Sequence, residues 1–151
     1  MQQPSKSYLD SKVLTASQPR LQLMLLEGAV RFGTQAQKMW HDGVEFASVD
    51  RQLARVAEIL EELTHGAAAG ESELSKAIES QYAAIYRELA SCRINEEVEK
   101  LESCLELLQY HRETWKLVCE QLESKAEPKQ SQVSPFVPFE SFTGESFSLE
   151  A

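Results

Sequence analysis

Metal binding is the first chemistry that the residue types of this chain could support. Residues 62–65 read Glu-Leu-Thr-His, the Glu-x-x-His spacing that helical di-iron proteins use on each of two helices. The second copy is absent, because residues 108–111 read Leu-Gln-Tyr-His, with leucine where the carboxylate is needed. Cys104 and His111 are seven positions apart, about 10 Å along a helix axis, too far for two ligands of one zinc ion. The sequence therefore predicts no metal site and no bound cofactor.

Nucleophilic catalysis has no more support than metal binding. The serine and threonine hydroxyls stand in no nucleophile-elbow pattern, and no glycine-rich phosphate loop occurs. His41 falls at a predicted helix end with no partner residue placed beside it. The three cysteines, Cys92, Cys104 and Cys119, form no CxxC motif and are odd in number, so we predict reduced thiols that serve as small core residues. We expect a protein that is not an enzyme.

The charge balance narrows the classes of partner. The 151 residues carry 15 Lys and Arg against 24 Asp and Glu, a formal net charge of −9. A nucleic-acid binder needs a basic face, and an anionic membrane repels an acidic surface, so neither partner is expected. No apolar run approaches the roughly 20 residues of a membrane span, and the first residues lack the apolar core of a secretory signal. We therefore predict a cytosolic protein.

The elements that would position these residues are helices. Between Pro19 and Pro128 the chain contains no proline, so helices can occupy the whole stretch. Apolar residues recur there at gaps of three and four, and turn-type glycines separate the runs. This pattern predicts an all-α fold, an antiparallel up-down four-helix bundle within residues 1–125, with Ser17 and Asn95 as N-caps. The predicted helices span about 17–42, 46–66, 71–93 and 95–124.

The first helix carries more apolar residues than one buried stripe needs. At 100° per residue its apolar residues fall on two nearly opposite faces. The face predicted to be the core stripe contains Leu21, Leu25, Gly28, Phe32, Ala36 and Met39, and the spare face contains Leu23, Leu26 and Val30. Another segment of the chain could cover the spare face, or the face could form a groove for the apolar side of a partner helix.

The other three helices each show one predicted core stripe. The predicted core residues are Phe46, Val49, Leu53, Val56, Leu60 and Leu63 on the second helix, Leu74, Ile78, Tyr82, Ile85, Leu89 and Cys92 on the third, and Val98, Leu101, Leu105, Leu108, Trp115, Val118 and Leu122 on the fourth. From Ala126 onward the helical pattern is lost, and residues 126–151 are predicted to be a disordered, acidic tail that contains phenylalanines.

Four stretches of the chain, in order and at compatible spacing, resemble the motifs of one protein family. The first, Tyr8 followed by Val13–Phe32, is similar to the family opening Y…V.TASP..L..MLYDGAI.F. Ile59–Leu63 resembles I-I-x-E-L, Tyr82–Leu89 resembles Y-x-Y-x-x-R-x-L, and Arg112–Trp115 resembles R-D-A-W. Together these stretches resemble the flagellin export chaperones, the FliS family, over residues 8 to about 120.

The chain departs from this family pattern at four positions. Gln18 interrupts the Ser-Pro pair, so that the proline stands one position later. Leu26 and Ala84 stand where the family pattern has tyrosine, and Arg93 stands where it has the asparagine that follows the third helix. The loss of the two tyrosines could alter which client the groove accepts.

The resemblance implies a non-enzymatic chaperone of the bacterial cytosol that binds the C-terminal segment of flagellin. Masking this segment would prevent premature polymerisation and keep flagellin competent for export. The family also implies contacts with the flagellar export gate and with other flagellar regulators, and an N-terminal segment that covers the groove. The predicted client contacts are Leu23, Leu26, Val30, Ile59, Tyr86, Tyr110 and Leu117, and the predicted cover residues are Tyr8, Leu9 and Val13. The alternative is a general helical adaptor for a different flagellar or secretion-system client.

The tail suggests one further hypothesis. Phe136, Phe139 and Phe142 repeat every three residues, so they could dock in the client groove as an internal competitor. A tail that stays undocked, or that contacts the export gate, is the alternative.

Overall fold

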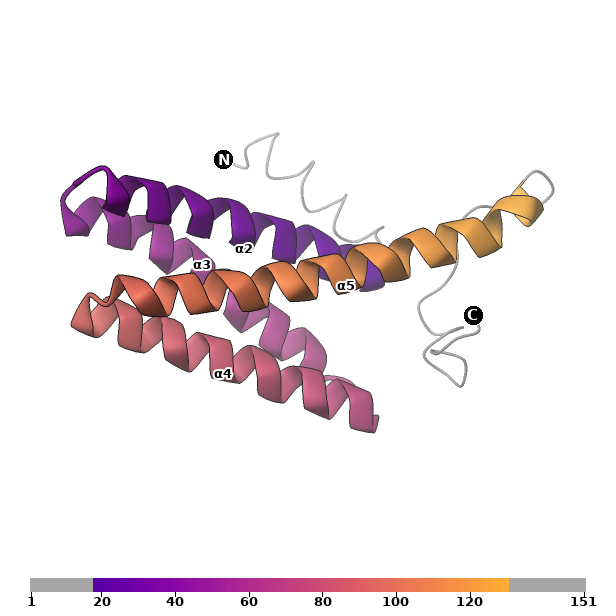
Figure 1. Cartoon of the computed structure of the whole chain (residues 1–151). Coiled ribbons are helices and arrows are strands. Elements are labelled where there is room, and N and C mark those ends of the chain that lie inside the picture. The colour runs from indigo at the N-terminus through magenta and orange to yellow at the C-terminus, as the bar shows by residue number, and fades with distance from the viewer. Residues whose placement is uncertain (1–17, 131–151) are drawn as a thin grey trace, which may run out of the picture. The chain divides into compact units, whose positions relative to one another are not determined.

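The computed structural model describes residues 18–130, with side chains described from 18 to 125 (Figure 1). This part of the chain is entirely helical apart from short turns, and it contains no strand, so the predicted all-α class is confirmed for the described residues. The four helices are α2 (Gln18–His41), α3 (Phe46–Ala68), α4 (Glu73–Asn95) and α5 (Val98–Gln130). Met24–Glu113 forms one compact unit, whereas residues 18–23 and 114–130 belong to a second unit.

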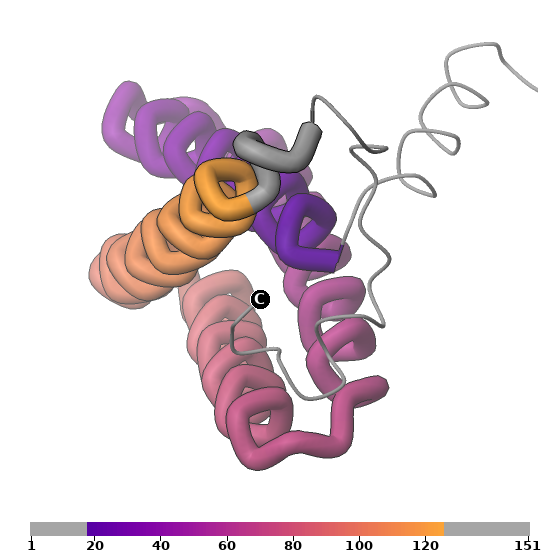
Figure 2. Tube along the Cα trace, turned by 90° about the vertical axis from the view of Figure 1, so that its right-hand side faces the viewer, coloured from indigo at the N-terminus to yellow at the C-terminus, as the bar shows by residue number. Residues whose placement is uncertain are grey.

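Local chemistry accounts for the ends of the helices. After α2, Gly43 adopts a φ of 82°, a left-handed conformation that glycine accepts without strain, and Val44 N–H donates to the Met39 carbonyl. Ser72 caps α4, because its hydroxyl oxygen accepts a hydrogen bond from Ser75 N–H at 3.0 Å. Figure 2 shows the turn that joins α3 to α4, just before this cap.

Three predicted boundaries differ from the structure. Helix α3 continues through Gly66 to Ala68, since a run of alanines follows the glycine and Ala67 is buried. Asn95 is the last residue of α4 rather than the N-cap of the next helix, because Glu96 takes the left-handed conformation that ends α4. Helix α5 runs to Gln130, beyond the predicted end near 124.

Within Met24–Glu113, successive helices run in opposite directions. Contacting positions rise along one helix as they fall along the next, which is the signature of antiparallel neighbours. The pairs are Gly28 with Ile59 and Phe32 with Arg55 (α2–α3), Asp50 with Arg93 and Glu61 with Tyr86 (α3–α4), and Ile85 with Cys104 and Glu88 with Lys100 (α4–α5).

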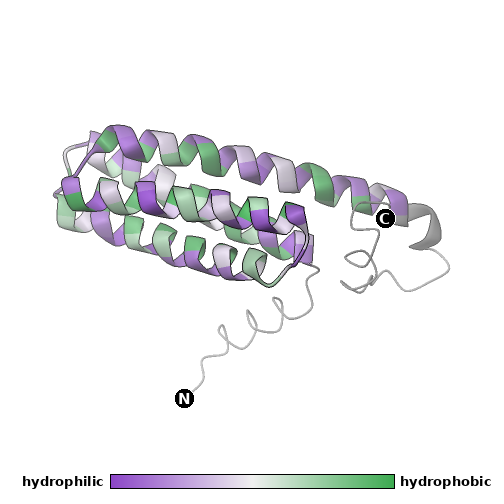
Figure 3. Cartoon of the chain, turned by 90° about the horizontal axis from the view of Figure 1, so that it is seen from below, coloured by the Kyte–Doolittle hydropathy of each residue, from purple (hydrophilic) through white to green (hydrophobic). Residues whose placement is uncertain are grey.

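The core uses most of the predicted stripes of α3, α4 and α5. Figure 3 shows hydrophilic and hydrophobic residues alternating along the helices, as expected for amphipathic elements. The three free cysteines are buried, which confirms their predicted role as core thiols. Phe46, Ile78, Val98, Val118 and Leu122 are only half-buried, and Leu74 is 51% exposed although it continues the α4 stripe. The fully buried predicted residues are Val49, Leu53, Val56, Leu60, Leu63, Tyr82, Ile85, Leu89, Cys92, Leu101 and Leu108, and Leu105 and Trp115 are buried almost completely.

Candidate functional site

The predicted assignment of faces on α2 is wrong. Leu23, Leu26 and Val30, which were predicted to form a spare face, retain 5%, 0% and 7% of their surface and belong to the core. On the predicted core face, Gly28 and Ala36 are buried as predicted, whereas Leu25 and Phe32 are only half-buried. This face contacts α3 through Gly28 and Phe32. Contact between a client and Leu23, Leu26 or Val30 therefore stays a prediction, and it would require α2 to be uncovered first.

The two predicted contact residues on α3 and α4 are half-buried and take part in helix packing. Ile59 lies beside Gly28, with its Cδ1 atom 3.4 Å from the place that a Cβ on Gly28 would occupy. The Tyr86 hydroxyl donates a hydrogen bond to the Glu61 carboxylate at 3.1 Å, and this bond raises the pKa of Tyr86. Both side chains keep only part of their surface available to a partner.

The largest accessible apolar side chains of the predicted site lie on α5. Tyr110 is 66% exposed and Leu117 is 54% exposed. Leu107, which was not singled out from the sequence, is 47% exposed. At 100° per residue these three lie within about 80° of one another, on the side of the helix opposite the buried Leu101 and Leu108. We call Leu107, Tyr110 and Leu117 the α5 stripe.

One flank of the α5 stripe is acidic. Glutamates recur at helical spacing along this flank, and at 100° per residue they lie within about 40° of one another. Their side chains are exposed, and none of them forms an ion pair within the described residues. We call these four residues, Glu102, Glu106, Glu113 and Glu120, the glutamate row. A segment that docks on the stripe therefore meets negative charge along one edge.

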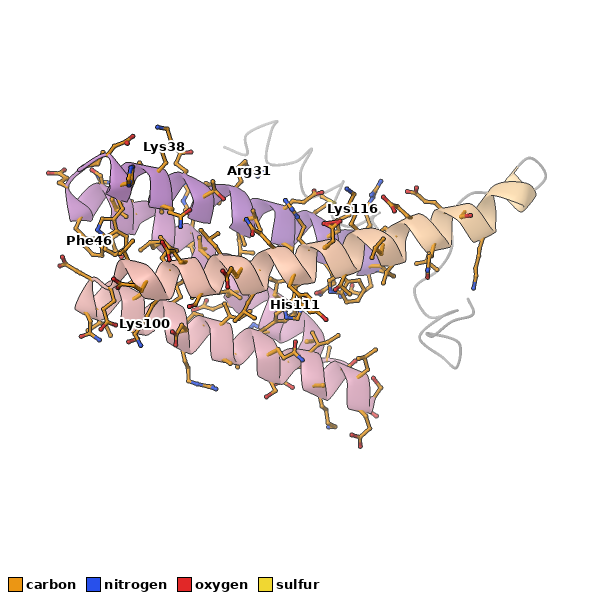
Figure 4. All side chains as sticks on the ribbon, viewed as in Figure 1. Arg31, Lys38, Phe46, Lys100, His111 and Lys116 are labelled. Atoms are coloured by element: carbon orange, nitrogen blue, oxygen red, sulfur yellow. The ribbon has the colours of Figure 1, made fainter. Side chains whose placement is uncertain are left out.

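The interior behind Tyr110 is apolar and uncharged at neutral pH. Figure 4 shows His111 between α5 and α4, and its ring lies 5.1 Å from the Tyr82 ring and 5.6 Å from the Tyr110 ring. Burial lowers the pKa of His111, so its imidazole is neutral near pH 7. The exposed Tyr110 ring therefore contacts a ring of the core edge-to-face, an arrangement that aromatic pairs favour.

The residues that first suggested metal chemistry do not converge. Glu62 and His65 are exposed on α3, whereas Cys104 and His111 are buried on α5. Within residues 18–125, no group of three or more metal-ligating side chains is close enough to hold an ion. Burial raises the pKa of Cys92 to about 11 and that of Cys104 to about 12, which keeps these thiols protonated and unreactive at neutral pH.

Two further findings concern membrane spans and the predicted residues outside the described part of the chain. None of the helices described is both long enough and apolar enough to cross a membrane. The predicted cover residues Tyr8, Leu9 and Val13 lie outside the described residues, as do residues 131–151 of the tail, including Phe136, Phe139 and Phe142.

Comparison with known proteins identifies the family. No curated protein matches the sequence. The family model described as flagellar protein FliS matches residues 1–122, which is most of the chain and includes all four motif stretches. The predicted family is confirmed, and the chain belongs to the FliS family of flagellar export chaperones.

Proposed function

We propose that this protein is a cytoplasmic chaperone that binds the C-terminal segment of flagellin on the α5 stripe and delivers it for export. Membership of the FliS family supports the chaperone activity and the flagellar client. The observation that carries the proposed location is the row of three large apolar side chains that α5 exposes at helical spacing. This is the pattern that an amphipathic client helix recognises.

The exposed fractions indicate how much affinity the stripe can supply. Leu107, Tyr110 and Leu117 are each about half exposed, so covering them contributes about 1 to 2 kcal/mol each. A client segment that is unstructured when free must become ordered on binding, which costs about 2 to 5 kcal/mol. The stripe therefore does little more than offset the ordering cost, and tight binding needs a longer client that makes further contacts. Ile59 and Tyr86, which keep part of their surface, are the proposed further contacts.

The N-terminal segment is the proposed cover when no client is bound. Residues 1–17 contain Tyr8, Leu9 and Val13 together with two lysines and one aspartate. Apolar side chains flanked by positive charge suit an apolar stripe flanked by the glutamate row. The same segment would leave when the client arrives, because both compete for one surface.

The division of the chain also remains a proposal. We propose that residues 1–125 carry the chaperone function and that 126–151 form a separate tail, although the α5 backbone continues into the tail as far as Gln130. Contacts with the export gate and with other flagellar regulators are proposed on the same family grounds.

The test is a calorimetric titration of the full chain with the C-terminal segment of flagellin from the same organism. We expect saturable binding with a large negative heat-capacity change. Tyr110→Asp should weaken it about tenfold or more, because it removes an anchor and adds charge beside the glutamate row. Leu74→Asp is the matched control, since Leu74 is 51% exposed at the N-terminal turn of α4, where an aspartate is tolerated.

Two results would contradict the proposal. The absence of binding would favour the alternative, a helical adaptor for a different flagellar or secretion-system client, which a survey of such clients would identify. An equal loss of affinity in Leu74→Asp and Tyr110→Asp would show that the client does not use the α5 stripe.

A further inference from the structure

Two arginines and two apolar side chains meet on the surface between α2 and α3. The Arg31 guanidinium carbon lies 5.8 Å from the centroid of the Phe32 ring, and that of Arg55 lies 5.3 Å from it. Phe32 and Ile59 are half-buried, whereas both arginines are exposed. Figure 4 shows Arg31 on the side of α2 that is turned away from α4. We call Arg31, Phe32, Arg55 and Ile59 the arginine cluster.

The two guanidinium groups have no carboxylate partner in the described part of the chain. Other cations there do have one, since Lys38, Arg93 and Lys100 each form an ion pair. Arg31 and Arg55 instead contact the same ring, in a protein with an excess of nine negative charges. A guanidinium held over an aromatic ring keeps its donors oriented and available for a carboxylate. The cluster therefore fits a segment that combines carboxylates with apolar side chains.

The last 21 residues of this chain have that chemistry. Residues 131–151 contain three glutamates, four phenylalanines and no lysine or arginine. Residues 1–17 are less suitable, because two lysines outnumber their one aspartate. The α5 stripe is also less suitable as a site for the tail, because the glutamate row would repel it.

We propose that residues 131–151 dock on the arginine cluster of the same chain, with tail glutamates paired to Arg31 and Arg55 and tail phenylalanines on Phe32 and Ile59. The tail is long enough to reach a site well away from its attachment point, since 21 extended residues span up to about 70 Å. The tail and the client then use different surfaces, apart from the shared Ile59. This differs from the sequence-based hypothesis, which placed the tail in the client groove.

Photo-crosslinking of the full chain tests the docking directly. Phe142 is replaced by p-benzoylphenylalanine, the chain is irradiated, and the crosslinked peptides are mapped by mass spectrometry. Equal amounts of chains labelled with ¹⁴N and ¹⁵N are mixed, so that crosslinks within one chain are distinguished from those between chains. We expect crosslinks within one chain to the α2 and α3 peptides that contain the arginine cluster.

Charge exchange then tests the proposed ion pairs. Arg31→Glu with Arg55→Glu should lower the crosslink yield about tenfold, the change expected for the loss of two surface ion pairs. Adding Glu140→Lys and Glu145→Lys to that variant should restore the yield. The control is Lys38→Glu with Lys116→Glu, which changes the net charge equally at exposed positions outside the cluster and should leave the yield unchanged.

Several outcomes would overturn the proposal. These are crosslinks that concentrate outside the cluster, crosslinks that join only differently labelled chains, no crosslinks, or a yield that the exchanged charges do not restore. Circular dichroism of each variant establishes that the helices are intact. No flagellin is present in this experiment, so its outcome is independent of the proposed client.

Discussion

Gly33 provides a sharp test of how closely α2 and α5 pack. A Cβ atom added at Gly33 would lie 2.7 Å from Leu105 Cδ2 and 3.5 Å from Leu105 Cγ, with Val56 Cγ2 at 3.9 Å. The first distance is far below van der Waals contact, and Leu105 is only 4% exposed, so its side chain must move within the packed core to make room for the added methyl group. A Cβ atom added at Gly28, five positions earlier on α2, would meet Ile59 Cδ1 at 3.4 Å and Arg31 Nη2 at 3.7 Å, which are both ordinary contacts. Alanine should therefore have opposite effects at the two positions.

The expected magnitudes follow from two competing effects. Replacing glycine by alanine inside a helix stabilises the fold by about 1 kcal/mol, because the unfolded chain loses conformational freedom. Overpacking a core costs about 1 to 3 kcal/mol. Gly28→Ala should thus raise the free energy of unfolding by up to about 1 kcal/mol, since the contact with Ile59 is ordinary. Gly33→Ala should lower it by up to about 2 kcal/mol.

Urea denaturation followed by circular dichroism at 222 nm measures both variants against the unaltered chain. The two variants differ by up to about 3 kcal/mol, which corresponds to a shift of up to about 1 to 3 M in the urea midpoint of unfolding, given the usual slopes for small proteins. If Gly33→Ala unfolds at the same or a higher urea concentration than Gly28→Ala, the close approach of α2 and α5 at Gly33 is refuted.

Three further predictions concern stability. Arg93→Ala should lower the free energy of unfolding by about 1 to 3 kcal/mol, because Arg93 donates two hydrogen bonds, of 2.7 and 3.1 Å, to the half-buried Asp50 carboxylate. Thermal melts measure the loss, and a loss no larger than that in Lys38→Ala, which breaks the exposed ion pair between Lys38 and Asp42, would contradict this prediction. Above pH 9 the stability should fall as pH rises toward 11, because burial raises the pKa values of Cys92 and Cys104 and the unfolded chain releases thiol protons that the folded chain keeps; replacing both cysteines by alanine should flatten this urea-unfolding profile. Below pH 6.5 the stability should fall with falling pH, because burial lowers the pKa of His111 and the unfolded chain gains a proton first; an unchanged acid profile in His111→Phe would count against this reasoning.

Much of the fold could be predicted from the sequence, because one stripe per helix determines which residues meet. On α3 and α4 the spacing of Val49 to Leu63 and of Tyr82 to Cys92 predicted the buried residues. Boundaries were less predictable. Glu96 takes a left-handed conformation that favours glycine, and nothing in its residue type indicates this. Arg93, a departure from the family pattern, pairs with Asp50 across 43 positions, a distance at which local patterns carry no information.

The candidate site was harder to predict than the fold. Tyr110 and Leu117 could be singled out because they lie off the buried stripe of α5. Leu107 lies three residues before Tyr110, so it falls on the same exposed face of α5. It was not singled out from the sequence because the adjacent Leu108 belongs to the core, and two consecutive leucines do not reveal which one is exposed. The glutamate row and the arginine cluster depend on which face of each helix is exposed, and composition alone does not determine this.

Helix α2 shows why an apolar surplus in a sequence does not by itself locate a binding groove. A helix with two apolar faces needs two neighbours, and both can come from the same fold. On α2, Gly28 and Phe32 contact α3 along one face, while Leu26 and Val30 are buried along the other. The additional apolar residues of α2 are thus buried within the chain's own fold. On α5, by contrast, Leu107, Tyr110 and Leu117 keep about half or more of their side-chain surface exposed, so a client-binding surface is better sought there than on α2.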